Sequence, residues 1–334
     1  MLDLNQKLHV LDSSTPLQGN LNLDMEAEYI TLPSRGIFYK GKYKNVDKLK
    51  IKKLGWAEED MLTTQSYYVN DMLFFEVLKS SIVDKNFPVG ELIEIDKNAI
   101  LWWLRIGAFG REYVIPHICS GEKCKKKYDI VWDLGSFQMP DYSLTYEKEL
   151  LDNNYITVSL PNNKIKFCLA PCSFNKSFEV NSLLNSLKNK DGKTYNITKK
   201  LINSIKLIID EEGKEYSSTA EIYKWLTTNK ISLPDSRFLQ KCIKEIELEI
   251  DTELIAECKH CGHTEPPMSL PMGNHFFGLN TAQYREYLIK SINFLTFWGK
   301  LDYQSVLAMS TAKRRSWIDM THDNLAILFP KSKK

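Results

Sequence analysis

Two cysteine-containing segments decide the fold of this 334-residue chain: VIPHICSGEKCKKKYDIVWDL (114–134) and AECKHCGHTEPPMSLPM (256–272). The first holds Cys119 and Cys124, and the second holds Cys258 and Cys261. The later pair has the form of a zinc knuckle, in which two thiolates three positions apart on a tight turn reach one ion at about 2.3 Å. Each segment therefore predicts one half of a metal site.

Alternating residues flank both cysteine pairs and predict two hairpins. Ile130, Trp132 and Leu134 would share one face of the first hairpin. Two hairpins meeting at one Zn²⁺ would form a zinc ribbon from residues 111–135 and 254–277, with residues 136–253 inserted between the halves. A closed set of four thiolates leaves no open coordination position, so this zinc would be structural and not catalytic.

Other readings of the same residues stay open at this point. The two hairpins could hold buried free thiols, because cysteine is among the most buried residue types. Three histidines near the cysteines compete as ligands, namely His117, His260 and His263. Cys168 and Cys172 are expected to be core residues. Seven cysteines, an odd number in a chain without a signal-peptide pattern, argue against a disulfide framework.

The rest of the chain divides into modules that differ in their expected secondary structure. We expect an N-terminal arm at 1–28, a strand followed by helices at 29–110, a hairpin with helices in the 136–253 insertion, and a helical module at 278–334. The predicted fold class is therefore α+β and mostly helical, with a discontinuous four-cysteine zinc-ribbon-like β unit that carries a helical insertion.

Local patterns add predictions within these modules. Asp96 is expected to cap a helix, and Ser310 to cap the final one. Two short strands should lie within residues 155–169 around a Pro-Asn-Asn turn. The spacing of apolar residues at 201–209 predicts a helix there. Aromatic residues at helical spacing in the C-terminal module indicate either a core or a surface that docks on a partner.

Composition excludes several classes of protein. The chain has 44 Lys+Arg against 42 Asp+Glu, a net charge of +2, which does not favour a protein that coats DNA. Its longest apolar stretch, residues 99–104, is far too short for a membrane span, so we expect a soluble protein. No Gly-rich phosphate loop, H-E-x-x-H or G-x-S-x-G is present, and we expect no enzymatic activity.

Several segments, read in order, resemble one known family. They are LPSRGIFY (32–39), WAEEDMLTTQSYY (56–68), DKNAILWWLRIGAFG (96–110), the two cysteine pairs, and SLPMGNHFF (269–277). Over roughly residues 29–278 the chain is similar to the baseplate hub subunit family of T-even-type contractile-tailed bacteriophages. The segment FWGKLDYQSVLAMSTAKRRSWI (297–318) looks like helical pieces of phage tail assembly factors.

The resemblance implies a protein that binds other phage tail proteins, among them the baseplate hub, tube or tape-measure protein. It would be a hub component or an assembly chaperone, working in the host bacterial cytoplasm during assembly or in the tail baseplate of the virion. The alternative is a zinc-ribbon protein that binds nucleic acid in transcription. In that case the following basic side chains would face phosphates: Lys123, Lys125, Lys126, Lys127, Arg314 and Arg315.

Overall fold

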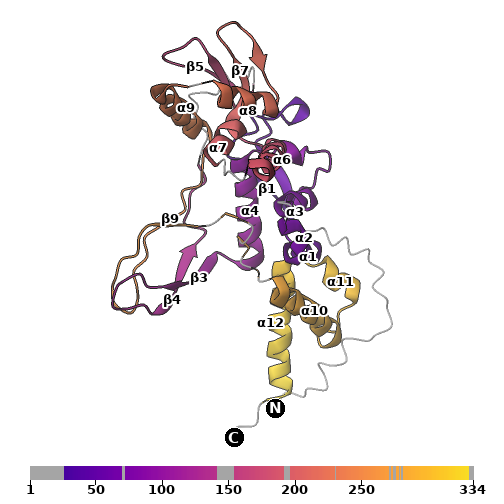
Figure 1. Cartoon of the computed structure of the whole chain (residues 1–334). Helices are drawn as coiled ribbons and strands as arrows, with labels where there is room; N and C mark the ends of the chain where they lie inside the picture. Colours follow the sequence, from indigo (N-terminus) through magenta and orange to yellow (C-terminus); the bar gives the residue numbers. More distant parts are fainter. Residues whose placement is uncertain are drawn as a thin grey trace.

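Helices and small antiparallel sheets make up the fold, so the predicted α+β class is confirmed (Figure 1). The computed structural model describes residues 26–69, 72–140, 154–191, 196–229, 231–270, 272–273, 276–277, 279 and 281–330. Most of the predicted N-terminal arm, residues 1–25, lies outside the described residues. The first strand begins at Ala27, so it includes the last two residues of the expected N-terminal arm.

The N-terminal region pairs two strands and packs four helices beside them. In the lysine-rich strand Lys48–Lys52, Leu49 and Ile51 are buried while lysines alternate with them. The elements are β1 Ala27–Thr31, η3 Gly41–Tyr43, β2 Lys48–Lys52, α1 Trp56–Thr63, α2 Gln65–Val69, α3 Leu73–Ser81, η4 Val89–Glu91 and α4 Glu94–Phe109. β1 and β2 are antiparallel.

The LPSRG segment forms a tight turn between β1 and β2. Gly36 adopts φ +70°, and a Cβ at this position would lie 2.5 Å from the backbone oxygen of Val46. Only glycine fits both the left-handed conformation and this close approach. The motif is therefore required by the backbone of the turn itself.

Asp96 fastens this turn to α4, and its predicted role as a helix cap is wrong. α4 begins at Glu94, so Asp96 lies in its first turn, fully buried. Its carboxylate accepts hydrogen bonds from the backbone N–H of Ser34 (2.9 Å), from the Ser34 hydroxyl and from Tyr39 Oη (2.5 Å). Burial raises the pKa of Asp96, although these hydrogen bonds act to lower it.

The inserted region has a four-stranded antiparallel sheet of order β5-β6-β7-β8 and its own core. The two strands expected within 155–169 are confirmed as β5 and β6. The elements are β5 Ile156–Ser159, β6 Lys166–Leu169, α6 Phe174–Asp191, α7 Asn196–Ser204, β7 Ile205–Ile209, β8 Glu215–Tyr216, α8 Thr219–Thr228 and α9 Leu233–Ile246.

The prediction of one helix through 201–209 is wrong, because α7 ends at Ser204 and a strand follows. The pairing of β6 with β7 shifts register, so that Cys168 faces Leu207 and Leu169 faces Ile205. The extra residue in β7 brings Ile205 and Ile208 to the same buried side. A β-bulge thus produced the three-residue spacing that resembled a helix.

The C-terminal region contains α10 Thr281–Phe297, α11 Tyr303–Ala308 and α12 Thr311–Leu328. Ser310 caps α12, as predicted, by accepting the backbone N–H of Lys313. The four residues of its small core are Ile292, Leu295, Val306 and Ile318. Across the described part of the chain, no helix combines the length and the apolarity that a membrane crossing needs.

A buried ion pair attaches this region to α1. The Arg314 guanidinium, 2% exposed, pairs with the fully buried Glu59 carboxylate. Tyr284 Oη donates a second hydrogen bond to Glu59 at 2.5 Å. Burial, followed by the charge of Glu59, raises the pKa of Tyr284. α10 and α12 therefore contact α1 through a buried polar cluster of three side chains, and Arg315 Nη1 adds a hydrogen bond to the Ala108 oxygen of α4 at 3.4 Å.

Candidate metal centre

The two cysteine pairs lie in an arm that projects from the helices at the lower left of Figure 1. One half of the arm is the antiparallel hairpin of β3 Glu112–Ile118 and β4 Lys127–Asp133. The other half contains β9 Glu253–Leu254 and β10 Met268–Ser269, which pair antiparallel. The arm is therefore built from segments on either side of the inserted region.

Aromatic packing attaches the arm to α4. Trp102 Nε1 donates to the backbone oxygen of Leu134 at 2.9 Å, and its ring stacks on Phe276 with centroids 5.6 Å apart. Phe276 also stacks on Tyr113 of β3. The alternation predicted from sequence is confirmed here, because Trp132 lies opposite Tyr113 on the buried face of the hairpin.

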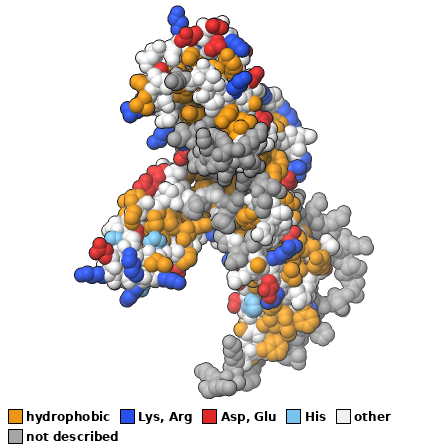
Figure 2. Space-filling view, in the orientation of Figure 1, with side chains coloured by type: hydrophobic (Ala, Val, Ile, Leu, Met, Phe, Trp, Pro, Cys, Tyr) orange, Lys and Arg blue, Asp and Glu red, His pale blue; other side chains and the backbone are white. Residues whose placement is uncertain are grey.

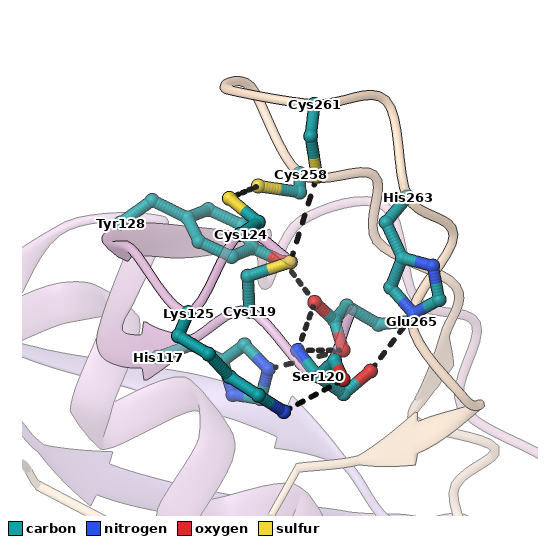
Figure 3. Close-up of polar contacts among 10 residues, drawn as sticks. All are labelled: His117, Cys119, Ser120, Cys124, Lys125, Tyr128, Cys258, Cys261, His263 and Glu265. Carbon is teal, nitrogen blue, oxygen red and sulfur yellow. Dashed lines mark hydrogen bonds and ion pairs between the residues drawn. The ribbon is translucent and has the colours of Figure 1, made fainter. Parts of the chain in front are cut away.

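The four cysteine sulfurs gather at the tip of this arm (Figure 3). All four lie within 4.8 Å of one another. Cys119 Sγ is 3.7 Å from Cys261 Sγ, and Cys124 Sγ is 4.0 Å from Cys258 Sγ. Four thiolates around one tetrahedral ion with metal–sulfur bonds of about 2.3 Å have sulfurs about 3.8 Å apart. The spacing therefore fits a single ion.

Each loop has the local geometry that lets two sulfurs point to one place. In the later pair, Cys258 N–H donates to the His263 oxygen (2.8 Å) and Gly262 N–H donates to the Cys258 oxygen (2.9 Å). Gly262 has φ +70°, which closes the turn at little steric cost. In the earlier pair, Cys119 N–H donates to the Lys126 oxygen at 3.0 Å and continues the hairpin ladder.

Backbone N–H groups point at the sulfurs and favour their charged form. Three cysteines receive one from the residue two positions further on: Cys119 from Gly121, Cys258 from His260 and Cys261 from His263. Burial acts to raise the pKa of Cys258, but the N–H groups lower it overall. Burial raises the pKa of Cys119 to about 12, and a bound cation would stabilise its thiolate form.

Glu265 joins the two halves of the arm beneath the sulfurs (Figure 3). Its buried carboxylate accepts Ser120 N–H (3.1 Å) and Tyr128 Oη (3.2 Å), and lies 3.3 Å from His117 Nε2. Hydrogen bonds from Ser120, with those of His117 and Tyr128, lower the pKa of Glu265 to about 2 despite its burial. The sequence analysis missed this residue, since a glutamate four positions after Cys261 follows no known ligand spacing.

The three histidines make other contacts. His117 faces Glu265, His260 Nε2 lies 3.3 Å from the Lys127 oxygen, and His263 Nε2 lies 2.9 Å from Ser120 Oγ. Within the described residues, the group that could hold an ion consists of the four cysteines alone. The histidines therefore position the loops that carry the sulfurs.

The other cysteines lie apart from this centre. Cys168 and Cys172 are buried in the inserted region, as expected, and Cys242 is half-buried on α9. All seven cysteines are free thiols. The 3.7 Å between Cys119 and Cys261 is far longer than the roughly 2.05 Å of a disulfide bond. The cluster is therefore compatible with a metal site.

Comparison with family models, with curated proteins and with solved structures returned no match.

Proposed function

We propose that this chain is a component of the tail baseplate hub of a contractile-tailed bacteriophage, or a chaperone for assembly of the hub and tape-measure protein, and that it acts by binding other tail proteins. The observation that carries the proposal is that the segments resembling this family make the contacts that hold separate elements of the fold together. The LPSRG turn is fastened to Asp96 on α4, and Phe276 beyond the knuckle stacks on Trp102 of the same helix.

The proposed ion of the centre is Zn²⁺. Tetrahedral sets of four thiolates suit zinc or iron–sulfur chemistry, and isolated single-ion sites of this kind are typical of zinc ribbons. The residues that would hold it are Cys119, Cys124, Cys258 and Cys261. Because all four positions would be filled by sulfur, the ion would hold the two halves of the arm together and would have no place for a substrate.

Affinity purification from phage-infected cells tests the tail assignment. A tagged chain should co-purify hub, tube or tape-measure proteins after nuclease treatment, and the tag alone should not. Recovery of RNA polymerase, or of DNA that resists a moderate salt wash, would overturn the assignment. Zinc bound at one ion per chain with no tail protein recovered would keep the metal centre and remove the proposed function.

One observation favours the alternative, a nucleic-acid-binding ribbon. Lysines 123, 125, 126 and 127 are exposed on the tip of the arm, and none forms an ion pair within the described residues. Arg314 cannot join them, because it is buried against Glu59. A zinc centre with four thiolates carries a net charge of −2, which offsets part of this basic charge. Binding to a DNA duplex that weakens steeply between low and moderate salt would support the alternative.

A further inference from the structure

A cavity lies between the N-terminal region and the inserted region. It has a volume of about 250 Å³ and is partly open to solvent. Its walls come from the connection between β1 and β2, through Phe38, and from the beginning of α6 and the end of α7. Backbone hydrogen bonds join the two regions beside it, from Glu94 N–H to the Cys172 oxygen (3.0 Å) and from Phe174 N–H to the Leu92 oxygen (3.2 Å). The two regions therefore form the cavity together.

Two asparagines that line the cavity have unused hydrogen-bond acceptors. They are Asn154, which precedes β5, and Asn203, on α7. The side-chain oxygen Oδ1 of each is buried and has no hydrogen-bond partner among the described residues. Burying such an oxygen without a donor costs free energy, and a ligand that brings its own donors removes this cost. The two oxygens therefore indicate a ligand with at least two hydrogen-bond donors.

The charges of the lining balance. The Thr219 hydroxyl accepts a hydrogen bond from Lys176 Nζ (3.0 Å) and donates one to Glu179 Oε2 (2.8 Å). Among the described residues, the charged side chains that line the cavity are Glu91, Lys176, Glu179 and Lys206, two of each sign. On the face drawn in Figure 2, basic and acidic side chains are also interspersed over the inserted region, at the top of the view. A ligand with a net charge would lose its hydration without an excess of opposite charge to offset the loss, so the lining favours a neutral ligand.

Apolar side chains provide the rest of the lining. They are Phe38, Ile93, Ala170, Pro171 and Ile205. The volume lies just below the range of about 300–1,000 Å³ that is typical of sites for drug-sized molecules, so the ligand is small. A sugar ring combines an apolar C–H face with hydroxyl groups that both donate and accept hydrogen bonds. An amino acid of similar size would instead bring two full charges, whose desolvation costs far more than that of hydroxyl groups.

From these observations we infer that the cavity binds a single neutral saccharide ring. Hydroxyl groups of the sugar donate to Asn154 Oδ1 and Asn203 Oδ1 and accept from the ammonium groups of Lys176 and Lys206. The C–H face of the ring packs on Phe38. The inference adds a small-molecule site to the proposed protein-binding function, and neither of the two depends on the other.

Saturation-transfer NMR on the purified full-length chain tests the inference. The probes are glucose, galactose, mannose and N-acetylglucosamine, each free and as the terminal residue of an oligosaccharide. At least one should bind, and its phosphorylated and amino derivatives should bind several times more weakly. Binding of the oligosaccharide as well as the free sugar would support the site and identify a glycan chain as the source. Binding of the free sugar alone would support the site for a free saccharide.

Two variants test the asparagine contacts. Asn203→Ala should weaken sugar binding about fivefold or more without lowering thermal stability, because the oxygen that it removes has no partner in the fold. Asn154→Gly should weaken binding to a similar degree, and glycine tolerates the left-handed conformation of this residue, φ +56°. Asn163→Ala is the matched control, since Asn163 Oδ1 is also buried without a partner but does not line the cavity. This control should bind the sugar as wild type does.

Four results would overturn the inference: no binding of any probe sugar, equal binding by wild type and both variants, tighter binding of a charged derivative, or an amino acid that competes for the same residues. Loss of binding in Asn203→Ala together with loss of thermal stability would also overturn it, because Asn203 would then support the fold. Sugar binding with no tail protein recovered from infected cells would retain the cavity as a site and remove the tail assignment.

Discussion

The metal-centre arm and the C-terminal helices are organised in opposite ways. In the arm, Glu265 of the later half accepts hydrogen bonds from Ser120 and Tyr128 of the earlier half, and the sulfurs converge on one point. In the C-terminal region, four buried apolar residues and one buried ion pair hold three helices, while large apolar side chains face solvent. The difference teaches that the arm directs its polar side chains and sulfurs inward across its two halves, whereas the C-terminal region leaves large apolar side chains exposed.

The largest expected effect comes from breaking the metal centre. Cys258→Ser should reduce bound zinc from about one ion per chain toward none and should unfold the arm, because metal-binding free energy in such sites is folding free energy, about 10–16 kcal/mol in isolated zinc fingers. Metal analysis and amide hydrogen exchange of β3 and β4 measure both effects. Cys242→Ser, outside the cluster, is the control. Purified protein without any bound metal would refute the centre.

The second effect concerns the attachment of the C-terminal region. Arg314→Met should cost about 3–5 kcal/mol of unfolding free energy, because it leaves the buried Glu59 carboxylate without its cation. Guanidinium unfolding measures the loss. Lys313→Met changes an exposed cation on the same helix and should cost little. Equal losses in the two variants would show that the buried pair is not the attachment.

Alkaline pH should weaken the same attachment. Burial and the Glu59 charge raise the pKa of Tyr284 above its usual value of 10.0, so the stabilisation that its proton confers is complete below pH 10 and declines as the pH rises further. Tyr284→Phe should cost about 1 kcal/mol at pH 8, for one lost hydrogen bond. The gap between wild type and variant should close above pH 10 in denaturant titrations. A gap that widens with pH would contradict the assignment.

The smallest effect is expected at the exposed apolar end of α12. Ile327→Ser and Phe329→Ser should each change the unfolding free energy by less than about 0.5 kcal/mol, because these side chains are already exposed. Ile130→Ser, at a buried position of β4, should cost several times more. Thermal unfolding compares them. A large loss at Ile327 would mean that this exposed end of α12 supports the fold.

Patterns that depend on neighbouring residues predicted much of the fold. The alternation of Ile130 and Trp132 identified the β4 strand, and Ser310 identified the start of α12. The expectation that four cysteines would come together also agrees with the clustered sulfurs. Such signals work because a hairpin face or a helix cap is defined within a few positions of the chain.

These local patterns did not predict contacts between residues that are distant in the sequence. Asp96 was expected to cap a helix and Glu265 had no expected role, yet each is buried and joins two segments. The β-bulge that places Ile205 and Ile208 on one side depends on the partner strand β6. Arg314 reads as a surface cation and is buried only because Glu59 lies opposite.

By itself, the sequence determined the cysteine pairs, the strand and helix patterns beside them and the α+β class, because these follow from local spacing. Only the tertiary structure decided that Cys124 and Cys258, 134 positions apart, share one centre. It also decided which charges are buried and which apolar residues of α10 and α12 stay exposed. Burial depends on what packs from elsewhere in the chain, and no local pattern contains that information.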